Sequence, residues 1–328
     1  MLVAVLWFVL GLMLLIKGGD WFVDGATGIA ERFHIPEILI GATVVSIGTT
    51  LPEVMVSATG AAKGLGAMAY GNAIGSVICN TSLIAALTIA VKPAAVDKKP
   101  LRLPVAFFFA AAALYSGAAY FAGEFSRPLG FLLLAMFVAY MALNIRNAFK
   151  GPDQEKEKAS AEPSEGEAKK EMPLWKELLL LVIGAALIAF GANLLVDNGT
   201  IIAKGLGVPD SVVALTFVAL GTSLPELVTA ITSLAKGHGA LSLGNVIGAN
   251  LFNLVLVSGV SVVISPFAVP AEKTISGINS SLIVDMPVMW IVMLLLTVPA
   301  LIRGKLSRVQ GILLLVIYFA FTIGQFLI

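Results

Sequence analysis

The stretch IGTTLPE at residues 47–53 recurs as LGTSLPE at residues 220–226, an interval of 173 residues. A second stretch, GNAIGS at 71–76, returns as GNVIGA at 244–249 after the same interval. Further pairs keep this interval without a gap: Gly11 with Gly184, Gly18 with Gly191, Asp24 with Asp197, Pro36 with Pro209, and Asn80 with Asn253. The constant interval indicates that the chain consists of two related halves.

The composition is typical of a membrane protein. Of the 328 residues, 58% are hydrophobic and 12% are charged, against roughly 45–50% and about 25% in soluble domains. Apolar runs of about 20 residues are long enough to cross a bilayer as helices. Ten such helices are predicted, near residues 2–27, 36–62, 68–92, 102–123, 128–148, 173–200, 208–235, 239–265, 280–301 and 308–327.

A charged stretch, GPDQEKEKASAEPSEGEAKKE, lies between the fifth and sixth predicted helices. It has no large apolar residue, so residues 149–172 are predicted to form a solvated linker. The linker joins a first five-helix repeat, residues 1–148, to a second, residues 173–328. Because five is an odd number, the second repeat must lie upside down in the membrane. The predicted fold is an all-α polytopic membrane protein with ten transmembrane helices in two inverted five-helix repeats.

Lys and Arg residues gather in every second loop. Loops that follow odd-numbered helices hold 16 of them, and loops that follow even-numbered helices hold four. Because cytoplasmic loops are enriched in Lys and Arg, the odd-numbered loops and the linker are predicted to be cytoplasmic. Both termini are then expected outside the cell membrane.

The residue inventory excludes several classes of function. A net charge of +1 argues against a nucleic-acid partner, and the single cysteine, Cys79, excludes an internal disulfide. The predicted helices offer no activated nucleophile, no catalytic Asp pair and no His cluster, so we expect no enzyme and no cofactor. An intramembrane hydrolase is a remote alternative.

Glu53 and Glu226 occupy equivalent places in the middle of the second and seventh predicted helices. An acidic side chain at the centre of a membrane helix costs roughly 2.5–3.5 kcal/mol on insertion scales. One explanation is a protonated carboxyl group that forms hydrogen bonds within the bundle. Two such groups in equivalent polar segments favour a functional site instead.

Other polar residues share the helix face of each glutamate. The spacing i, i+3, i+4, i+7 places on one face of the second helix Ser46, Thr49, Thr50 and Glu53. The equivalents in the seventh helix are Ala219, Thr222, Ser223 and Glu226. Pro52 and Pro225 lack an N–H, so each is expected to open its helical turn. The carbonyls freed there, including those of Thr49 and Thr222, are candidate oxygen ligands.

The third and eighth predicted helices carry a further polar stripe. Its members at i, i+4 and i+8 are Asn72, Ser76 and Asn80 in the first half, and Asn245, Ala249 and Asn253 in the second. Small and amide residues are also common helix contacts in membranes, and that alternative stays open for Asn72 and Asn245. For Asp20, Asp24, Asp197 and Lys17, toward the ends of helices, we expect ion pairs or interfacial anchoring.

The candidate ligands are therefore carboxylate, hydroxyl, amide and carbonyl oxygens. Such hard donors suit Ca²⁺ or Na⁺ and disfavour Cu or Zn. Two carboxylates neutralise one Ca²⁺ or two Na⁺. The predicted partners are these two ions, as transported substrates, and the lipid bilayer.

Each half of the chain resembles one of the two signature repeats of the calcium/cation antiporter superfamily. The stretches that carry this resemblance are GTTLPE with GNAIGSVICN in the first half and GTSLPE with GNVIGANLFN in the second. The resemblance covers essentially the whole chain and points to the Na⁺/Ca²⁺ exchanger branch. The short linker leaves no room for large calcium-sensing domains and is similar to that of compact prokaryotic members. The resemblance implies a secondary antiporter that exchanges Na⁺ for Ca²⁺ by alternating access, with the first and sixth helices sliding across the rest.

The resemblance also implies four adjoining cation sites at the bilayer midplane. The Ca²⁺ site would use Glu53, Glu226 and the carbonyls of Thr49 and Thr222. The Na⁺ sites would use the Ser46 carbonyl, Thr50 and Ser76 on one side, and the Ala219 carbonyl and Ser223 on the other. Asn80 and Asn253 would line the middle position.

This chain departs from the family pattern at two places. Ala249 stands where a serine is expected, which removes one Na⁺ ligand, and Asn253 is acidic in some relatives, including potassium-dependent ones. Both leave the number of Na⁺ ions per Ca²⁺ open. Proton/calcium exchangers of the superfamily resemble GNAxE, whereas the fifth residue here is Gly75 or Gly248. Proton coupling is therefore the alternative, and a passive channel is disfavoured by the inverted repeats.

Overall fold

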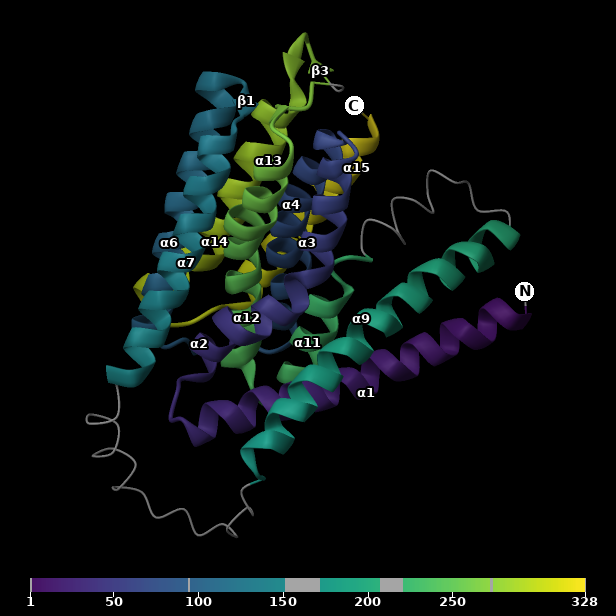
Figure 1. Ribbon diagram of the computed structural model, residues 1–328, viewed down its shortest axis with the longest axis vertical. Coiled ribbons are helices and arrows are strands. Elements are labelled where there is room, and N and C mark those ends of the chain that lie inside the picture. The colour runs from purple at the N-terminus through teal and green to yellow at the C-terminus, as the bar shows by residue number, and fades with distance from the viewer. Residues whose placement is uncertain (1, 94, 151–171, 207–220, 272–273, 328) are drawn as a thin grey trace.

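The computed structural model describes residues 2–93, 95–150, 172–206, 221–271 and 274–327 (Figure 1). Within these ranges, nine helices are long and apolar enough to cross a membrane. Those of the first half are α1 (Leu2–Arg32), α2–η1–α3 (Glu37–Ile40, Gly41–Val45, Ser46–Ala62), α4–η2–α5 (Gly66–Cys79, Asn80–Ala85, Ala86–Val91), α6–η3 (Lys98–Gly117, Ala118–Ala122) and α7 (Arg127–Lys150). The chain is a multi-pass integral membrane protein.

The second half contains the remaining helices. They are α9 (Leu174–Gly205), α11 (Leu224–Ala235), α12–η5–α13 (Gly239–Phe252, Asn253–Val257, Ser258–Ile264), η6–α14 (Ser281–Asp285, Met286–Arg303) and α15 (Arg308–Leu327). The predicted seventh helix, 208–235, is described only from residue 221 onward, so the count of ten stays a prediction. The predicted linker lies outside the described residues, apart from its first two residues and its last.

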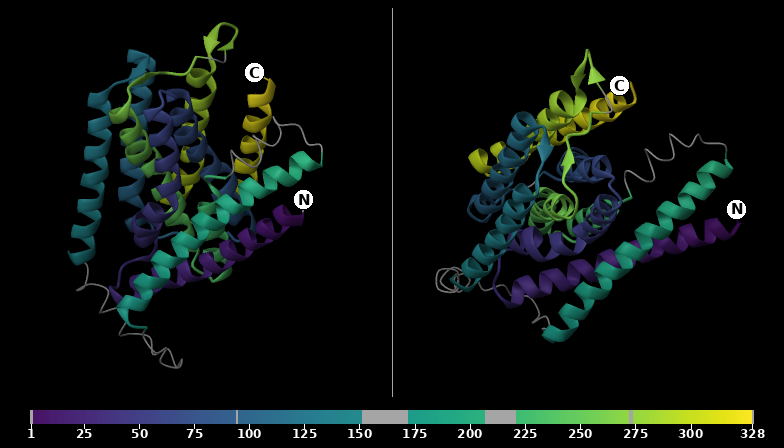
Figure 2. Two further views of the ribbon diagram at one scale, coloured as in Figure 1. Left: turned by 45° about the vertical axis from the view of Figure 1, so that its right-hand side comes forward. Right: turned by 45° about the horizontal axis from the view of Figure 1, so that its top comes forward.

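α1 and α9 lie side by side and cross the other helices obliquely (Figures 1 and 2). An oblique helix needs more residues to cross the same thickness, which explains why α1 extends to Arg32 instead of the predicted residue 27. Glycines bring the two backbones together. A Cβ added at Gly18 would lie 2.9 Å from the Gly184 carbonyl oxygen, and one at Gly11 would lie 2.9 Å from the Gly191 carbonyl oxygen.

The centre of the remaining bundle is formed by α12 and α13. In this span 78% of the residues are buried, whereas the α15 span is 17% buried and lies at the edge. α12 packs against η1 and α3 of the first half. Glycines permit the close approach, because a Cβ at Gly244 would clash with the backbone of Ile38 and one at Gly248 with that of Ala42.

Two π-helical segments begin at equivalent asparagines of the two halves. η2 begins at Asn80 and η5 at Asn253, 173 residues later. Each continues an α-helix and passes into another without a break. A π-helical turn changes the hydrogen-bond register of the backbone and is frequent at functional sites. The polar stripe predicted on the third and eighth helices therefore ends in irregular backbone in both halves.

The expected opening of the helix is not found at Pro52. α3 runs as a continuous α-helix through Pro52, and the irregular turn is η1, just before α3 begins. One missing N–H removes only one hydrogen bond, and η1 can absorb the associated bend. In the second half, Thr222 and Ser223 lie in a turn, and Pro225 stands in the first turn of α11, where a missing N–H has no cost.

Short strands, absent from the predicted all-α fold, lie in the loops, and one pair of them joins the two halves. β1 (Glu124–Phe125) pairs with β2 (Phe267–Ala268), and β3 (Thr274–Ile275) pairs with β4 (Ile278–Asn279). At the opposite end, a bridge connects Ala95 with Lys305. Two-residue strands in polar loops carry no periodicity by which the sequence could predict them.

Candidate cation site

Four helices of the two halves meet around the candidate site. α3 packs against α4, α11 and α12, and α11 packs against α12. α3 contributes Glu53 and α11 contributes Glu226, and both side chains are 0% exposed. The two helices are in direct contact with each other. The glutamates that the sequence places in separate helices thus face a common interior.

Many polar atoms at this place have no hydrogen-bond partner in the part of the chain that the structure describes. Among the described residues, the buried side chains with an unpartnered oxygen or nitrogen include Thr50, Glu53, Asn80, Ser223, Glu226 and Asn253. All six are candidates chosen from the sequence. Because about 90% or more of buried polar groups in proteins are hydrogen-bonded, such a cluster of unpartnered donor oxygens fits a cation as its ligand.

Thr49 and Ser46 use their hydroxyl groups in helix packing. The Thr49 hydroxyl donates to the Asn245 Oδ1 over 3.2 Å, and the Ser46 hydroxyl donates to the carbonyls of Gly41, over 2.7 Å, and Asn245, over 3.0 Å. Their side-chain oxygens are therefore engaged, whereas the family resemblance assigns only their carbonyls to ions. Asn245 acts as a contact between α12 and α3, the alternative that the sequence left open.

Asn72 has the same bridging position on the other side of the site. Its amide nitrogen donates to the Ser57 hydroxyl over 2.7 Å and to the Glu53 carbonyl over 3.1 Å. Its Oδ1 accepts from the Thr222 hydroxyl over 3.4 Å. Asn72 therefore joins α3, α4 and the turn before α11, and it holds the backbone next to Glu53. Ser57 was not a candidate in the sequence, because its repeat equivalent, Ala230, has no polar group.

Ser76 and Asn72 border a cavity of about 370 Å³. The cavity lies between α3, α4, the Thr222 turn and α15, and it extends to Gln325 near the C-terminal end of α15. Gly71 and Gly75 also line it, and no described atom lies within 4 Å of a Cβ added at either glycine. Their repeat equivalents, Gly244 and Gly248, are packed tightly against the first half, so the two halves differ in access.

Ala219 lies outside the described residues. Ala249 is 0% exposed on α12, next to the packed Gly248. One buried amide that sequence comparison missed is Asn250, whose nitrogen donates to the Thr81 hydroxyl over 2.7 Å while its Oδ1 is unpartnered within the described chain. Its repeat equivalent is Val77, so the repeat carries no signal there.

Comparison with known proteins places the chain among transporters. The profile of the sodium/calcium exchanger protein family matches residues 3–146 and 176–327. An uncharacterized membrane protein of Methanocaldococcus jannaschii is 36% identical over 97% of this chain and 96% of its own length. The sodium/calcium exchanger MaX1 of Methanosarcina acetivorans is 29% identical, with 97% of each chain covered.

The fold agrees with a solved exchanger. The structure of the sodium-calcium exchanger NCX_Mj soaked with 2.5 mM Na⁺ and 0.1 mM Ca²⁺ superposes with a TM-score of 0.80, at 34% identity and with 97% of each chain covered. The matched residues include both signature repeats and both buried glutamates. The chain therefore belongs to the sodium/calcium exchanger family, whose members are cation antiporters and not enzymes.

Proposed function

We propose that the protein exchanges Na⁺ for Ca²⁺ across the cell membrane by alternating access. The observation that carries the proposal is the pair of fully buried glutamates, whose carboxylate oxygens have no hydrogen-bond partner among the described residues and are surrounded by neutral oxygen donors. A divalent ion between Glu53 and Glu226 neutralises both charges, and so do two monovalent ions. Ca²⁺ and Na⁺ are hard cations that prefer such ligands. One Ca²⁺ or two Na⁺ would therefore remove the electrostatic cost of burying two negative charges in one site.

The proposed ligand sets follow the family resemblance. Ca²⁺ would be held by both glutamates and by the carbonyls of Thr49 and Thr222. One Na⁺ site would use the Ser46 carbonyl, Thr50 and Ser76, and another the Ala219 carbonyl and Ser223. Asn80 and Asn253 would line the middle position. These assignments are supported by side-chain atoms that have no partner within the described ranges, in Thr50, Ser223, Asn80 and Asn253.

We propose further that residues 1–148 and 173–328 are inverted five-helix repeats, with the linker cytoplasmic and both termini outside. The contacts of α1 with α9 support the inversion. Gly11 faces Gly191 and Gly18 faces Gly184, while the repeat relates Gly11 to Gly184 and Gly18 to Gly191. Exchanging the halves therefore reproduces the same antiparallel contacts. In this orientation the cavity beside Ser76 leads outward, and the conformation is outward-facing.

A proton-coupled Ca²⁺ exchanger is the second candidate. Ala249 favours it, because a missing hydroxyl weakens one of the Na⁺ sites. The two candidates differ in the gradient that drives transport. Purified protein is reconstituted in vesicles, which are loaded in turn with Na⁺, with K⁺ or with acid, and ⁴⁵Ca²⁺ uptake is measured. We expect ⁴⁵Ca²⁺ to enter only those vesicles that are loaded with Na⁺. Uptake that depends on the pH gradient and not on Na⁺ would contradict the proposal and indicate proton coupling.

A further inference from the structure

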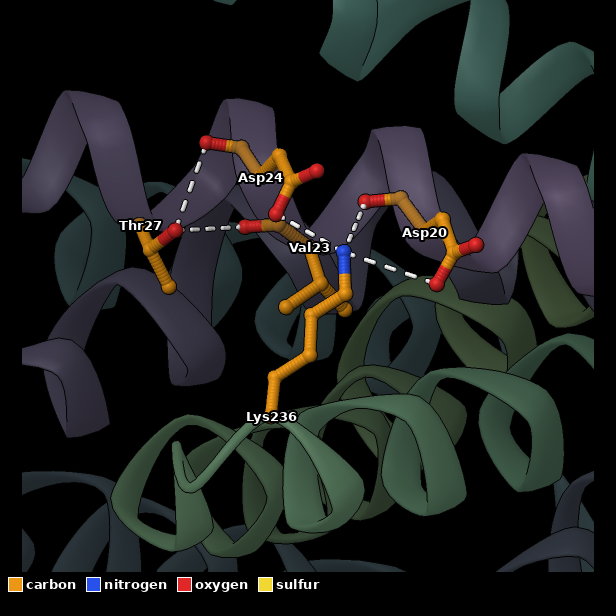
Figure 3. A network of polar contacts seen from close by, with 5 residues as sticks. All are labelled: Asp20, Val23, Asp24, Thr27 and Lys236. Carbon is orange, nitrogen blue, oxygen red and sulfur yellow. Dashed lines mark hydrogen bonds and ion pairs between the residues drawn. The ribbon is translucent and has the colours of Figure 1, made fainter.

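An ion-pair network connects the oblique helix α1 to the end of α11 (Figure 3). Lys236 directly follows α11, and its Nζ lies 2.8 Å from Asp24 Oδ1 and 3.5 Å from Asp20 Oδ1. The same Nζ donates to the Asp20 carbonyl over 3.0 Å. One lysine therefore holds two successive turns of α1 against the helix that carries Glu226.

The repeat contains the same charges at the opposite end of the molecule. Lys63, 173 residues before Lys236, directly follows α3, and Asp197, 173 residues after Asp24, lies on α9. Both are exposed, and within the described chain neither forms an ion pair. The two halves thus carry equivalent lysine–aspartate pairs, of which one is closed and the other is open.

The closed pair lies next to a helix whose glycines are packed tightly against the first half. Lys236 belongs to a loop predicted to be cytoplasmic, and the tightly packed Gly244 and Gly248 lie on the helix that follows it. Lys63 belongs to a loop predicted to be outside, and the helix after it carries Gly71 and Gly75, which line the cavity. The formed pair thus lies on the side of the packed glycines, and the open pair lies on the side of the cavity.

We propose that the pairs Lys236–Asp24 and Lys63–Asp197 form alternately, and that the two lysines are positioning residues that set the direction in which the candidate site opens. This inference rests on the proposed alternating access, in which the inverted halves exchange conformations. When α1 and α9 shift across the bundle, α1 moves away from Lys236 and α9 approaches Lys63. The pair that is closed in the outward-facing conformation opens, and its equivalent closes.

The two pairs differ in strength. Lys236 has a second carboxylate, Asp20, whose repeat equivalent is the neutral Asn193. The cytoplasmic pair is therefore the stronger one, which favours the outward-facing conformation in the absence of ions. An exposed ion pair changes an equilibrium by a few tenths to about 1 kcal/mol, so each charge should shift the balance by about two- to five-fold.

Cross-linking of cysteine pairs tests the alternation. Lys236→Cys is combined with Asp24→Cys in one protein, and Lys63→Cys with Asp197→Cys in another. A short, cleavable bifunctional thiol reagent replaces a direct disulfide, because a Lys–Asp pair holds its Cα atoms farther apart than a disulfide tolerates. We expect both pairs to cross-link during ion exchange, each cross-link to stop exchange, and reduction to restore it. If the Lys63–Asp197 pair never cross-links in an active exchanger, the alternation is wrong.

Charge variants in the Lys63→Cys, Asp197→Cys protein test the positioning role. Lys236→Met should raise the initial rate of cross-linking by about two- to five-fold, because it weakens the opposite pair. Glu31→Gln is the matched control, since Glu31 is exposed on α1, the helix that carries Asp24, forms no ion pair with the described residues and should leave the rate unchanged. Equal rates with Lys236→Met and Glu31→Gln would overturn the role. The initial rate of cross-linking depends on the conformation and not on which ion is transported. It therefore tests the positioning role even if transport is coupled to protons and not to Na⁺.

Discussion

Arg32 and Glu177 join the oblique helices α1 and α9 at one end by a two-point ion pair. Arg32 Nε lies 2.9 Å from Glu177 Oε2, and Nη2 lies 2.9 Å from Oε1. The arginine side chain is 26% exposed but the glutamate side chain only 4%. Glycine leaves room for the carboxylate, because a Cβ at Gly28 would lie 3.0 Å from Glu177 Cγ. Water can therefore reach the guanidinium of Arg32 but not the carboxylate of Glu177.

This difference predicts unequal costs for removing the two partners. Arg32→Met leaves a buried carboxylate without its counter-ion, which typically costs about 3–5 kcal/mol. Arg32 also bonds the Met172 carbonyl, and that contact is lost as well. Glu177→Gln keeps an acceptor for the arginine and leaves a charge that water can solvate, so about 1 kcal/mol is expected. The arginine variant should be the less stable one.

Reversible unfolding in mixed micelles, followed by intrinsic tryptophan fluorescence, measures both costs. The double variant Arg32→Met, Glu177→Gln is the control, because it removes the stranded charge and should regain most of the stability lost in Arg32→Met. The explanation is refuted if Glu177→Gln destabilises the protein as much as Arg32→Met does. It is also refuted if the double variant is no more stable than Arg32→Met alone.

Three further predictions concern the candidate site. Glu53→Gln and Glu226→Gln should each abolish Ca²⁺ transport but leave folding intact, because a neutral amide is easier to bury; normal ⁴⁵Ca²⁺ flux in either variant would remove that residue from the site. Protons compete with cations for the two carboxylates, so the affinity for Ca²⁺ should fall on acidification; a calorimetric titration series that shows no change between neutral and acidic pH would contradict the assignment. Ala249→Ser supplies one additional ligand, worth about 0.5–1.5 kcal/mol, and should lower the Na⁺ concentration for half-maximal exchange a few-fold, with little effect on Ca²⁺; an unchanged Na⁺ dependence would argue for proton coupling.

Much of the site could be predicted because its signals are local or repeated. A carboxylate in an apolar run, such as Glu53, is costly wherever the helix packs. Its repetition as Glu226 predicted a shared interior before any packing was known. The same holds for Asn80 and Asn253, which begin the equivalent π-helical segments. Each of these features depends on residue identity and interval alone.

The remaining features depend on packing that has no pattern in the sequence. The sequence predicted an ion pair or an anchor for Asp24 but could not identify Lys236 as its partner, since 212 residues separate them. It also located the irregular turn at Pro52, whereas the structure places it earlier, at η1. A proline removes one hydrogen bond, but the neighbouring helices decide where the backbone bends. Asn250 was not predicted because its equivalent in the first half is not polar.

The central claim is that Na⁺ and Ca²⁺ compete for one site built around both glutamates. Equilibrium binding of ⁴⁵Ca²⁺ to the purified protein, titrated with Na⁺, tests it most directly. We expect saturable Ca²⁺ binding that Na⁺ displaces completely and cooperatively, and no specific binding to Glu53→Gln or Glu226→Gln. Ca²⁺ binding that persists at saturating Na⁺, or that survives the loss of either carboxylate, would contradict the claim.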